Sequence, residues 1–197
     1  MSDGDILKGT TLRQPHEVIG HGLARRDALA ELTKVAARYA IAITPEVADL
    51  IDTADPGDPI ALQYVPDAAE LREAPGEDGD PIGDHAHMPV EGIVHRYPDR
   101  VLLKPVHVCA VYCRFCFRRE MVGPGKSPTL SGEAYAAALD YIRAHEDIWE
   151  VILTGGDPLM LSARRLREIV ADLAAIDHVK IVRIHSRVPV ADPARID

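Results

Sequence analysis

The sequence predicts an α/β fold in which about three parallel strands form part of a (β/α) barrel, preceded by a helical amino-terminal extension. Strand-like and helix-like segments alternate in the second half of the chain, an order that implies right-handed crossovers and a parallel sheet. The stretch before it is interrupted by prolines and rich in Asp and Gly. We therefore divide the chain into a helical extension with a wrapping connector, residues 1–92, and a barrel part, residues 93–197.

Two segments of the extension have the pattern of helices. Residues 27–41 place apolar side chains at helical spacing, and Asp27 stands where a capping residue is expected. The Thr44-Pro45-Glu46 sequence has the composition of a helix start and predicts a second short helix that runs through Ile51. Six prolines then interrupt residues 52–89, which predicts a connector built of turns and extended segments.

One part of this connector, EDGDPIGDHAH at residues 77–87, combines carboxylates with two histidines and raises the question of a metal site. Its acidic residues do not complete the spacing of a calcium loop with its terminal glutamate. A solvated loop is therefore the preferred interpretation.

Five segments of the barrel part carry the periodicity of strands or helices. In order they are a strand at 101–108, a helix at 130–146, a strand at 149–155, a helix at 162–176 and a strand at 179–186. Ser131 and Ser162 stand at the starts of these helices and are predicted to cap them. A sheet of three such strands has an open edge, so we expect the chain to be part of a larger barrel.

Composition limits the function classes. The hydrophobic content of 47% suffices for one sizeable core. No run approaches the roughly 20 apolar residues of a membrane helix, and the amino terminus lacks the apolar stretch of a secretory signal. A net charge of −9 argues against general attraction to nucleic acid or to anionic membranes. We expect a cytoplasmic protein.

All three cysteines of the chain, Cys109, Cys113 and Cys116, lie in a C-x3-C-x2-C arrangement directly after a predicted strand. An odd number of cysteines within eight residues makes a disulfide framework a poor explanation. A [4Fe-4S] cubane takes one thiolate per iron, so three cysteines leave one iron open. That iron can chelate the amino and carboxylate groups of S-adenosylmethionine and pass the electron that cleaves it into a radical.

Two other interpretations of the cysteines stay open. A structural zinc site could combine the three thiolates with His107, although a histidine on the preceding strand would face away from the turn. Three buried cysteines without any ligand are the simplest alternative. The position at the carboxyl end of a strand, where barrel sites form, favours the cluster.

The segments HRYPDRVLLKPVHVCAVYCRFCFRREMVG and ILTGGDPL resemble the lysine 2,3-aminomutase family of radical S-adenosylmethionine enzymes, which also use pyridoxal phosphate. The resemblance extends from about Arg38 to the carboxyl terminus, and the first 25 or so residues add little to it. It implies that the barrel is a radical S-adenosylmethionine barrel and that this chain covers its amino-terminal part.

The resemblance implies ligands for two anionic groups. Arg96, Tyr97 and Arg100 would contact the phosphate of pyridoxal phosphate, for which guanidinium groups are well suited. The alternative is an exposed turn with ion pairs to acids such as Asp99. Arg118 matches the arginine that holds the carboxylate of the amino acid substrate.

The resemblance also implies contacts to S-adenosylmethionine. Gly155, Gly156 and Asp157 match the motif that binds its ammonium group, since glycines permit a close backbone approach and a carboxylate accepts hydrogen bonds. Phe115 matches a position that borders the adenine, with ordinary packing as the alternative. No catalytic residue is assigned beyond these.

Several other polar residues receive no functional role. Arg114, Arg119 and Glu120 are expected to form ion pairs. His185, near the end of the third predicted strand, is expected to be a hydrogen-bonded histidine.

The activity implied by the resemblance moves an amino group from the 2- to the 3-position of an amino acid, L-lysine in the first place. Pyridoxal phosphate would hold the substrate, the adenosyl radical would remove a hydrogen, and a flavodoxin or ferredoxin would supply the electron. The partners are thus a small-molecule amino acid and an electron donor. The oligomeric state stays open, with a homo-oligomer as one option.

The family's lysine that anchors pyridoxal phosphate has no match among the lysines of this chain, which are Lys8, Lys34, Lys104, Lys126 and Lys180. If the natural protein ends at Asp197, we expect aminomutase turnover to be lost, and β-lysine formation by this chain would contradict that. Two alternatives are modification of a lysine on a protein such as translation elongation factor P, and a non-catalytic metal-binding domain. A substrate trial and an anaerobic iron and sulfide analysis separate them.

Overall fold

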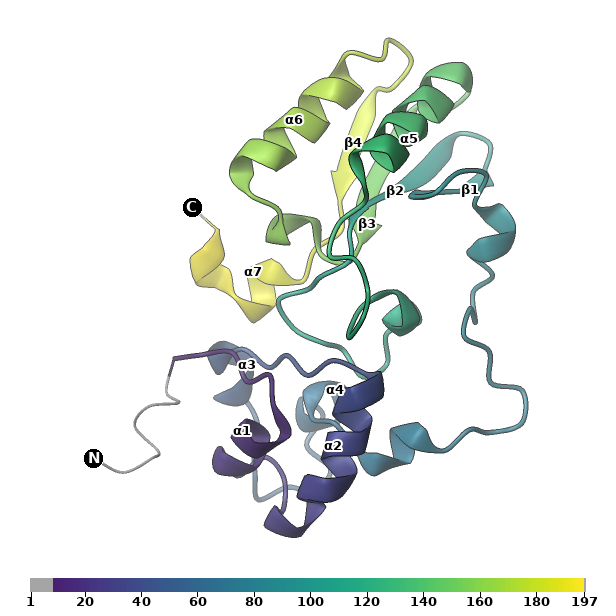
Figure 1. Cartoon of the computed structure of the whole chain (residues 1–197). Coiled ribbons are helices and arrows are strands. Elements are labelled where there is room, and N and C mark those ends of the chain that lie inside the picture. The colour runs from purple at the N-terminus through teal and green to yellow at the C-terminus, as the bar shows by residue number, and fades with distance from the viewer. Residues whose placement is uncertain (1–8, 197) are drawn as a thin grey trace. The chain divides into compact units, whose positions relative to one another are not determined.

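The computed structural model describes residues 9–196, which form two compact units. The first, here the helical unit, contains residues 9–79, 109–125 and 189–196. The second, the sheet unit, contains Asp80–Val108 and Lys126–Val188 (Figure 1). The segment that carries the cysteines, Cys109–Cys116 and here called the cysteine loop, thus belongs to the same compact unit as the amino-terminal helices. The predicted division at residue 92 rests on the sequence pattern and not on spatial contacts, so it stays a prediction.

Four strands form one mixed sheet in the order β1-β2-β3-β4. They are β1 (Ile93–Tyr97), β2 (Arg100–Val106), β3 (Glu150–Gly155) and β4 (Ile181–Ile184). The strands β2, β3 and β4 are parallel, which confirms the three predicted parallel strands. The strand β1 was not predicted; it pairs antiparallel with β2, so the HRYPDR segment is a tight hairpin instead of an isolated turn.

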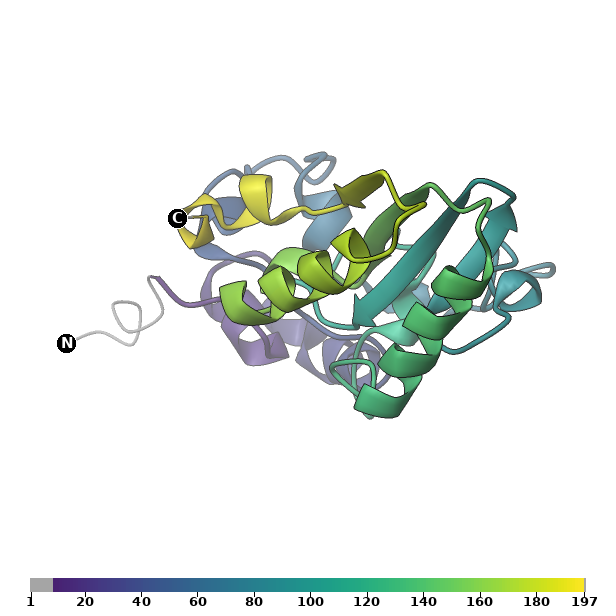
Figure 2. The ribbon, with the colours of Figure 1, turned by 90° about the horizontal axis from the view of Figure 1, so that it is seen from above.

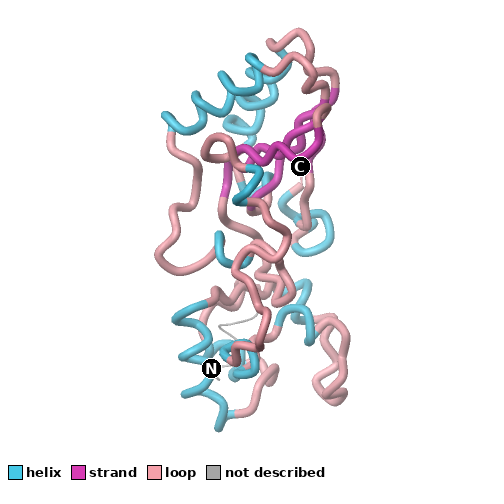
Figure 3. The backbone as a smooth tube through the Cα atoms, turned by 90° about the vertical axis from the view of Figure 1, so that its right-hand side faces the viewer, coloured by secondary structure: helices cyan, strands magenta, loops and turns pink. Residues whose placement is uncertain are grey.

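Two helices, α5 (Gly132–Ala144) and α6 (Ala163–Ala174), provide the crossovers between the parallel strands. Both lie on the same face of the sheet (Figures 2 and 3). The hydroxyl groups of Ser131 and Ser162 accept backbone hydrogen bonds from the residue three positions on, at 3.1 and 3.2 Å. Both predicted caps are therefore confirmed.

The core of the sheet unit lies between the two helices and one face of the sheet. Alternate residues of the strands point toward the helices, as strand geometry requires. The fully buried members from the strands are Ile93, Val101, Leu103, Val151 and Leu153, and those from the helices include Ala138, Ile142, Ile169 and Leu173.

The helical unit is built from short helices: α1 (Pro15–Gly20), α2 (Leu29–Arg38), α3 (Pro45–Ala48), α4 (Ala61–Tyr64) and most of α7 (Val188–Ala191). Single 3-10 turns complete the described secondary structure at Arg26–Ala28, Ala68–Leu71, His85–His87, Arg119–Met121, Pro158–Met160 and Pro193–Arg195.

Two predicted details of the amino-terminal helices are wrong. Asp27 does not cap α2, because its carboxylate forms a bidentate ion pair with Arg25 at 2.6 and 3.0 Å and the chain enters the helix through a 3-10 turn. The second helix begins at Pro45 as predicted but ends at Ala48. The Thr44 hydroxyl does not cap this helix; it donates to the carbonyl of Ala191 within the helical unit.

The connector segment 77–87 forms a loop in which Asp80 accepts hydrogen bonds from the backbone N–H groups of Asp84 (2.9 Å) and His85 (2.7 Å). The bond from His85 is the main cause of a lowered pKa for Asp80. The prediction of a loop is confirmed. None of the helices within residues 9–196 combines the length and the apolar character needed to cross a bilayer.

Replacement of Leu153 by alanine tests the assignment of the core. This side chain is fully buried in β3, so Leu153→Ala should lower the free energy of unfolding by about 2–5 kcal/mol. The control Val170→Ala removes methyl groups from a side chain of α6 that is 37% exposed and should change it by about 0.5 kcal/mol or less. Urea denaturation followed by circular dichroism measures both, and equal effects would contradict the described packing.

Candidate functional site

The cysteine loop begins three residues after β2 ends at Val106. Cys109, Cys113 and Cys116 are each partly exposed. The backbone N–H of Cys116 donates to the carbonyl of Cys113 at 3.1 Å, which makes a tight turn between the second and third cysteines. The loop therefore presents all three thiols from a short stretch of irregular backbone.

The residues between the first two cysteines anchor the loop in the helical unit. Ala110, Val111 and Tyr112 are buried, and the last two belong to the two apolar clusters of this unit. The backbone N–H of Tyr112 donates to the carbonyl of Ala42 at 2.9 Å. Its phenol lies away from water, and this burial raises its pKa well above the usual value. The loop is thus tied by side chains and backbone to the segment after α2.

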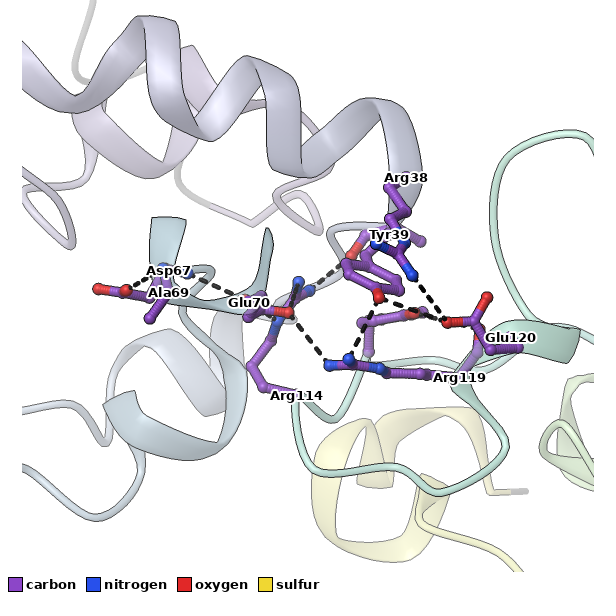
Figure 4. A network of polar contacts seen from close by, with 10 residues as sticks. Arg38, Tyr39, Asp67, Ala69, Glu70, Arg114, Arg119 and Glu120 are labelled. Carbon is purple, nitrogen blue, oxygen red and sulfur yellow. Dashed lines mark hydrogen bonds and ion pairs between the residues drawn. The ribbon is translucent and has the colours of Figure 1, made fainter. Parts of the chain in front are cut away.

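Arg114 continues this anchoring (Figure 4). Its backbone N–H donates to the carbonyl of Gln63 at 2.8 Å, and its guanidinium binds the Glu70 carboxylate through two hydrogen bonds of 2.9 and 2.5 Å. The side chain is only 6% exposed. The expectation that Arg114 forms an ion pair is confirmed.

The residues that follow the third cysteine join the same network (Figure 4). Arg119 donates to the Tyr39 hydroxyl at 3.1 Å and lies 3.8 Å from the Glu70 carboxylate. Tyr39 in turn donates to Glu120 at 3.3 Å, and Glu120 lies 4.0 Å from Arg38. The ion pairs expected for Arg119 and Glu120 are therefore confirmed.

Phe115 and Phe117 flank the third cysteine on the sequence, and both are exposed, by 56% and 48%. Phe115 is therefore not a residue of the core. The Arg118 guanidinium lies 4.7 Å from the centre of the Phe117 ring, an arrangement that leaves its planar face beside an exposed aromatic surface.

Gly155 ends β3 in the sheet unit and Gly156 follows it, and both pass very close to the end of β2. Gly155 has φ +102°, and a Cβ there would lie 2.8 Å from the carbonyl oxygen of Val106. A Cβ on Gly156 would overlap the backbone of Val108. The backbone N–H of Gly156 donates to Val106 at 2.7 Å, so the close approach is held by a hydrogen bond. Only glycine fits both positions.

Asp157 is buried, with 4% of its surface exposed, and ties this turn to the segment after β4. One carboxylate oxygen accepts from the Ser186 hydroxyl at 2.7 Å and from the N–H of Leu159 at 3.0 Å. The other accepts from the N–H groups of Arg187 at 2.6 Å and Val188 at 3.2 Å. Sequence reasoning missed Ser186, whose only signal was a hydroxyl at the last position of a predicted strand.

The three residues expected to bind a phosphate lie in the β1–β2 hairpin. Arg96 donates to the carbonyl of Ile82 and lies 3.7 Å from Asp84. Tyr97 is 60% exposed and pairs with Arg100 where the hairpin turns, after a register irregularity in β1.

Arg100 forms a bidentate ion pair with Asp99 at 2.7 and 2.9 Å and lies 3.6 Å from the buried Glu150. The Arg100 guanidinium and, next to it, the indole of Trp149 hold the pKa of Asp99 well below its usual value. The ion pair with Asp99 that the alternative named is present, in a hairpin and not an isolated turn. Binding of a phosphate by these residues stays a prediction. Arg100 starts β2 whereas Gly155 ends β3, so the two motifs lie at opposite ends of the parallel strands.

The two histidines considered earlier lie outside the strands. His107 follows β2 and its Nδ1 lies 3.1 Å from the carbonyl oxygen of Ser127. The expectation that it belongs to the strand is wrong by one residue. His185 follows β4 and is exposed, and its backbone N–H donates to Leu153 at 3.0 Å.

Within residues 9–196, no three side chains of His, Cys, Asp or Glu converge on one point as a single metal ion requires. This holds for the cysteine loop and for the connector loop at 77–87. A cubane makes a different demand, because each thiolate binds its own iron and the sulfur atoms stay apart. The donor set of the cysteine loop fits such a cluster.

Comparison with known proteins agrees with these motifs. Residues 103–197 match the model of the Radical SAM superfamily. The chain is 45% identical to the L-lysine 2,3-aminomutase of Clostridium subterminale over 156 residues, which are 79% of this chain and 37% of that protein. For the L-lysine 2,3-aminomutase of Methanococcus maripaludis the identity is 44% over 167 residues, 84% of this chain and 38% of the relative.

A third relative, the L-lysine 2,3-aminomutase of Escherichia coli K12, is 37% identical over 158 residues, 80% of this chain and 45% of that protein. The chain therefore spans less than half the length of each of these relatives. The resemblance inferred from the motifs is confirmed, and the four-stranded open sheet is a partial radical S-adenosylmethionine fold.

The buried hydrogen bonds of Asp157 give a testable prediction. Asp157→Asn keeps the shape but places an NH2 donor against backbone N–H donors, so it should lower the free energy of unfolding by about 1–3 kcal/mol. Hydrogen exchange of the amides of Arg187 and Val188 should also accelerate. Asp140→Asn is the control, because the Asp140 side chain is 75% exposed in a surface pair with Arg143. Equal exchange in both variants would show that Asp157 does not hold this segment.

Proposed function

Since residues 103–197 are a radical S-adenosylmethionine segment and most of the chain is similar to lysine 2,3-aminomutases, we propose that Cys109, Cys113 and Cys116 bind a [4Fe-4S] cluster with one open iron. S-adenosylmethionine binds to that iron. The whole protein moves an amino group between the 2- and 3-positions of an amino acid, L-lysine in the first place. When bound, the cluster supplies the electron that cleaves S-adenosylmethionine into a radical.

The observation that carries this proposal is the anchored loop. Its backbone is fixed at Tyr112 and Arg114, while its three thiols stay at least partly exposed. A site with these properties can take up a cluster without rearrangement of the core around it. Thiol ligands also require a reducing compartment, which is the basis for placing the protein in the cytoplasm.

The Gly155-Gly156-Asp157 segment is proposed to bind the ammonium group of S-adenosylmethionine. The two glycines let the backbone of this turn pass against the end of β2, which fixes its course beside the proposed ligand. Both Asp157 oxygens already accept hydrogen bonds within the sheet unit, so the role of this carboxylate is to fix the turn and to add negative charge near the ammonium. Phe115, exposed on the cysteine loop, offers an aromatic face for the adenine.

The remaining assignments rest on the family resemblance. Arg96, Tyr97 and Arg100 would hold the phosphate of pyridoxal phosphate, for which Arg96 and Arg100 must exchange their present carboxylate partners for the phosphate. Arg118 would bind the carboxylate of an amino acid substrate. An electron donor such as flavodoxin or ferredoxin would reduce the cluster, and the protein could act as a homo-oligomer.

The cluster proposal is tested by anaerobic reconstitution of the 197-residue chain with iron and sulfide. We expect a broad absorption near 400 nm that is typical of [4Fe-4S] clusters, at roughly four irons per chain. Cys109→Ser, Cys113→Ser and Cys116→Ser should each lose most of this iron. Ser127→Ala, a change on the surface of the sheet unit, is the control.

Reduced wild-type protein should then convert S-adenosylmethionine to 5'-deoxyadenosine and methionine, and the three cysteine variants should not. Zinc, or no metal, in the reconstituted wild-type chain would refute the proposal. A bound cluster without cleavage would refute the assignment of the open iron.

A further inference from the structure

The sequence assigned no role to Arg114, yet its side chain is among the most enclosed charged groups of the helical unit. Arg114 lies between the second and third cysteines of the loop. Its side chain is 6% exposed and that of its partner Glu70 is 12% exposed. A buried ion pair is costly to desolvate and is weak evidence for stability alone, so its position at this loop requires another explanation.

Each of the three nitrogen atoms of the Arg114 guanidinium has a hydrogen-bond acceptor. Its Nε and Nη2 atoms donate to the two oxygens of Glu70, and Nη1 donates to the carbonyl of Ala40 at 2.6 Å. The flat group also lies 4.7 Å from the centre of the Tyr112 ring. These contacts fix the orientation of the planar fork, and with it the backbone of the loop between Cys113 and Cys116.

Glu70 is itself held in place. It is the third residue of the 3-10 turn Ala68–Leu71, and its carboxylate accepts from the backbone N–H of Asp67 at 3.0 Å. The Asp67 carboxylate reciprocates by accepting from the N–H of Ala69 at 2.7 Å. This capping box orients the Glu70 carboxylate before any contact with the loop is made.

Glu70 also reaches the other side of the third cysteine. Arg119 lies 3.8 Å from the carboxylate that binds Arg114, so arginines on both sides of Cys116 in the sequence approach one acidic group (Figure 4). Arg119 is held in addition by the hydroxyl of Tyr39, and its guanidinium lies 4.2 Å from the centre of that ring.

We propose that Glu70 is a positioning residue for the iron-sulfur cluster: through Arg114 and Arg119 it sets the loop around Cys116 and balances the positive charge beside the cluster. This inference rests on the proposed function, in which the three cysteines hold the cluster. It follows from geometry, since a loop fixed before iron binds loses less conformational entropy on binding. It follows also from charge, since two guanidinium groups without Glu70 would favour the more negative, reduced cluster.

Two variants separate geometry from charge. Glu70→Gln removes the negative charge but retains an acceptor for the capping box, which accepts glutamine equally. Arg114→Lys retains the positive charge but loses the planar fork and its bidentate contact. Glu168→Gln is the matched control, because Glu168 also lies beside two arginines, Arg164 at 3.4 Å and Arg165 at 3.2 Å, on the exposed surface of α6.

Each reconstituted 197-residue protein is measured in two ways under anaerobic conditions. The first is the concentration of chelator that removes half of the iron. The second is the midpoint potential of the cluster, from a redox titration followed by electron paramagnetic resonance. Circular dichroism and thermal unfolding of the metal-free proteins report on folding.

Loss of a residue that supports metal ligands typically weakens metal binding by about 10- to 100-fold. We therefore expect the half-removal concentration of chelator to fall at least about tenfold in both variants. The midpoint potential should rise in Glu70→Gln, and it should stay at the wild-type value in Arg114→Lys, because only the first variant changes the charge. Both quantities should be unchanged in Glu168→Gln.

The inference would be overturned if both variants kept the chelator resistance and the midpoint potential of the wild-type protein. The same conclusion would follow if both variants lost only thermal stability, or if neither folded, because the pair would then serve the fold in general and not the loop. A wild-type chain that takes up no cluster would instead refute the proposed function, so the two failures are distinguishable.

Discussion

The contact between the cysteine loop and the amino-terminal helices is the interaction on which the organisation of this chain depends. Glu70 and Arg114 are separated by 44 positions, and their bidentate pair closes a long loop that contains the connector and the strands β1 and β2. The conformational entropy that is lost when a loop closes increases only slowly with the length of the loop. The buried residues Ala110, Val111 and Tyr112 contribute the apolar area that offsets this cost.

A consequence is that the chain leaves the helical unit twice and returns to it twice. It leaves the helical unit after Gly79, builds β1 and β2, returns with the cysteine loop, and leaves again to build α5, β3, α6 and β4. The segment that carries the cysteines therefore packs against residues that lie much earlier in the sequence. The described residues 9–79 are thus part of the environment of the loop.

The parallel strands, both crossover helices and their serine caps could be predicted, because each depends on local periodicity and on residues within a few positions. Asp27 misled the prediction because a nearby arginine competes for its carboxylate. The strand β1 was missed since a five-residue segment with two apolar residues at its start has little periodicity of its own. It is a strand because β2 offers it a partner.

For the candidate site, the sequence identified the cysteines and the glycine turn, whose spacing is local. It could not identify Glu70 as the partner of Arg114, or Ser186 as a partner of Asp157, because these pairs join segments 44 and 29 positions apart. Many carboxylates and hydroxyls in the chain could have filled either place. Only the fold selects among them.

The antiparallel strand β1 also limits the architecture that this sheet can adopt. It occupies the hydrogen-bonding edge of β2 that faces away from β3, so no further parallel strand can pair there. The parallel array can therefore lengthen only beside β4.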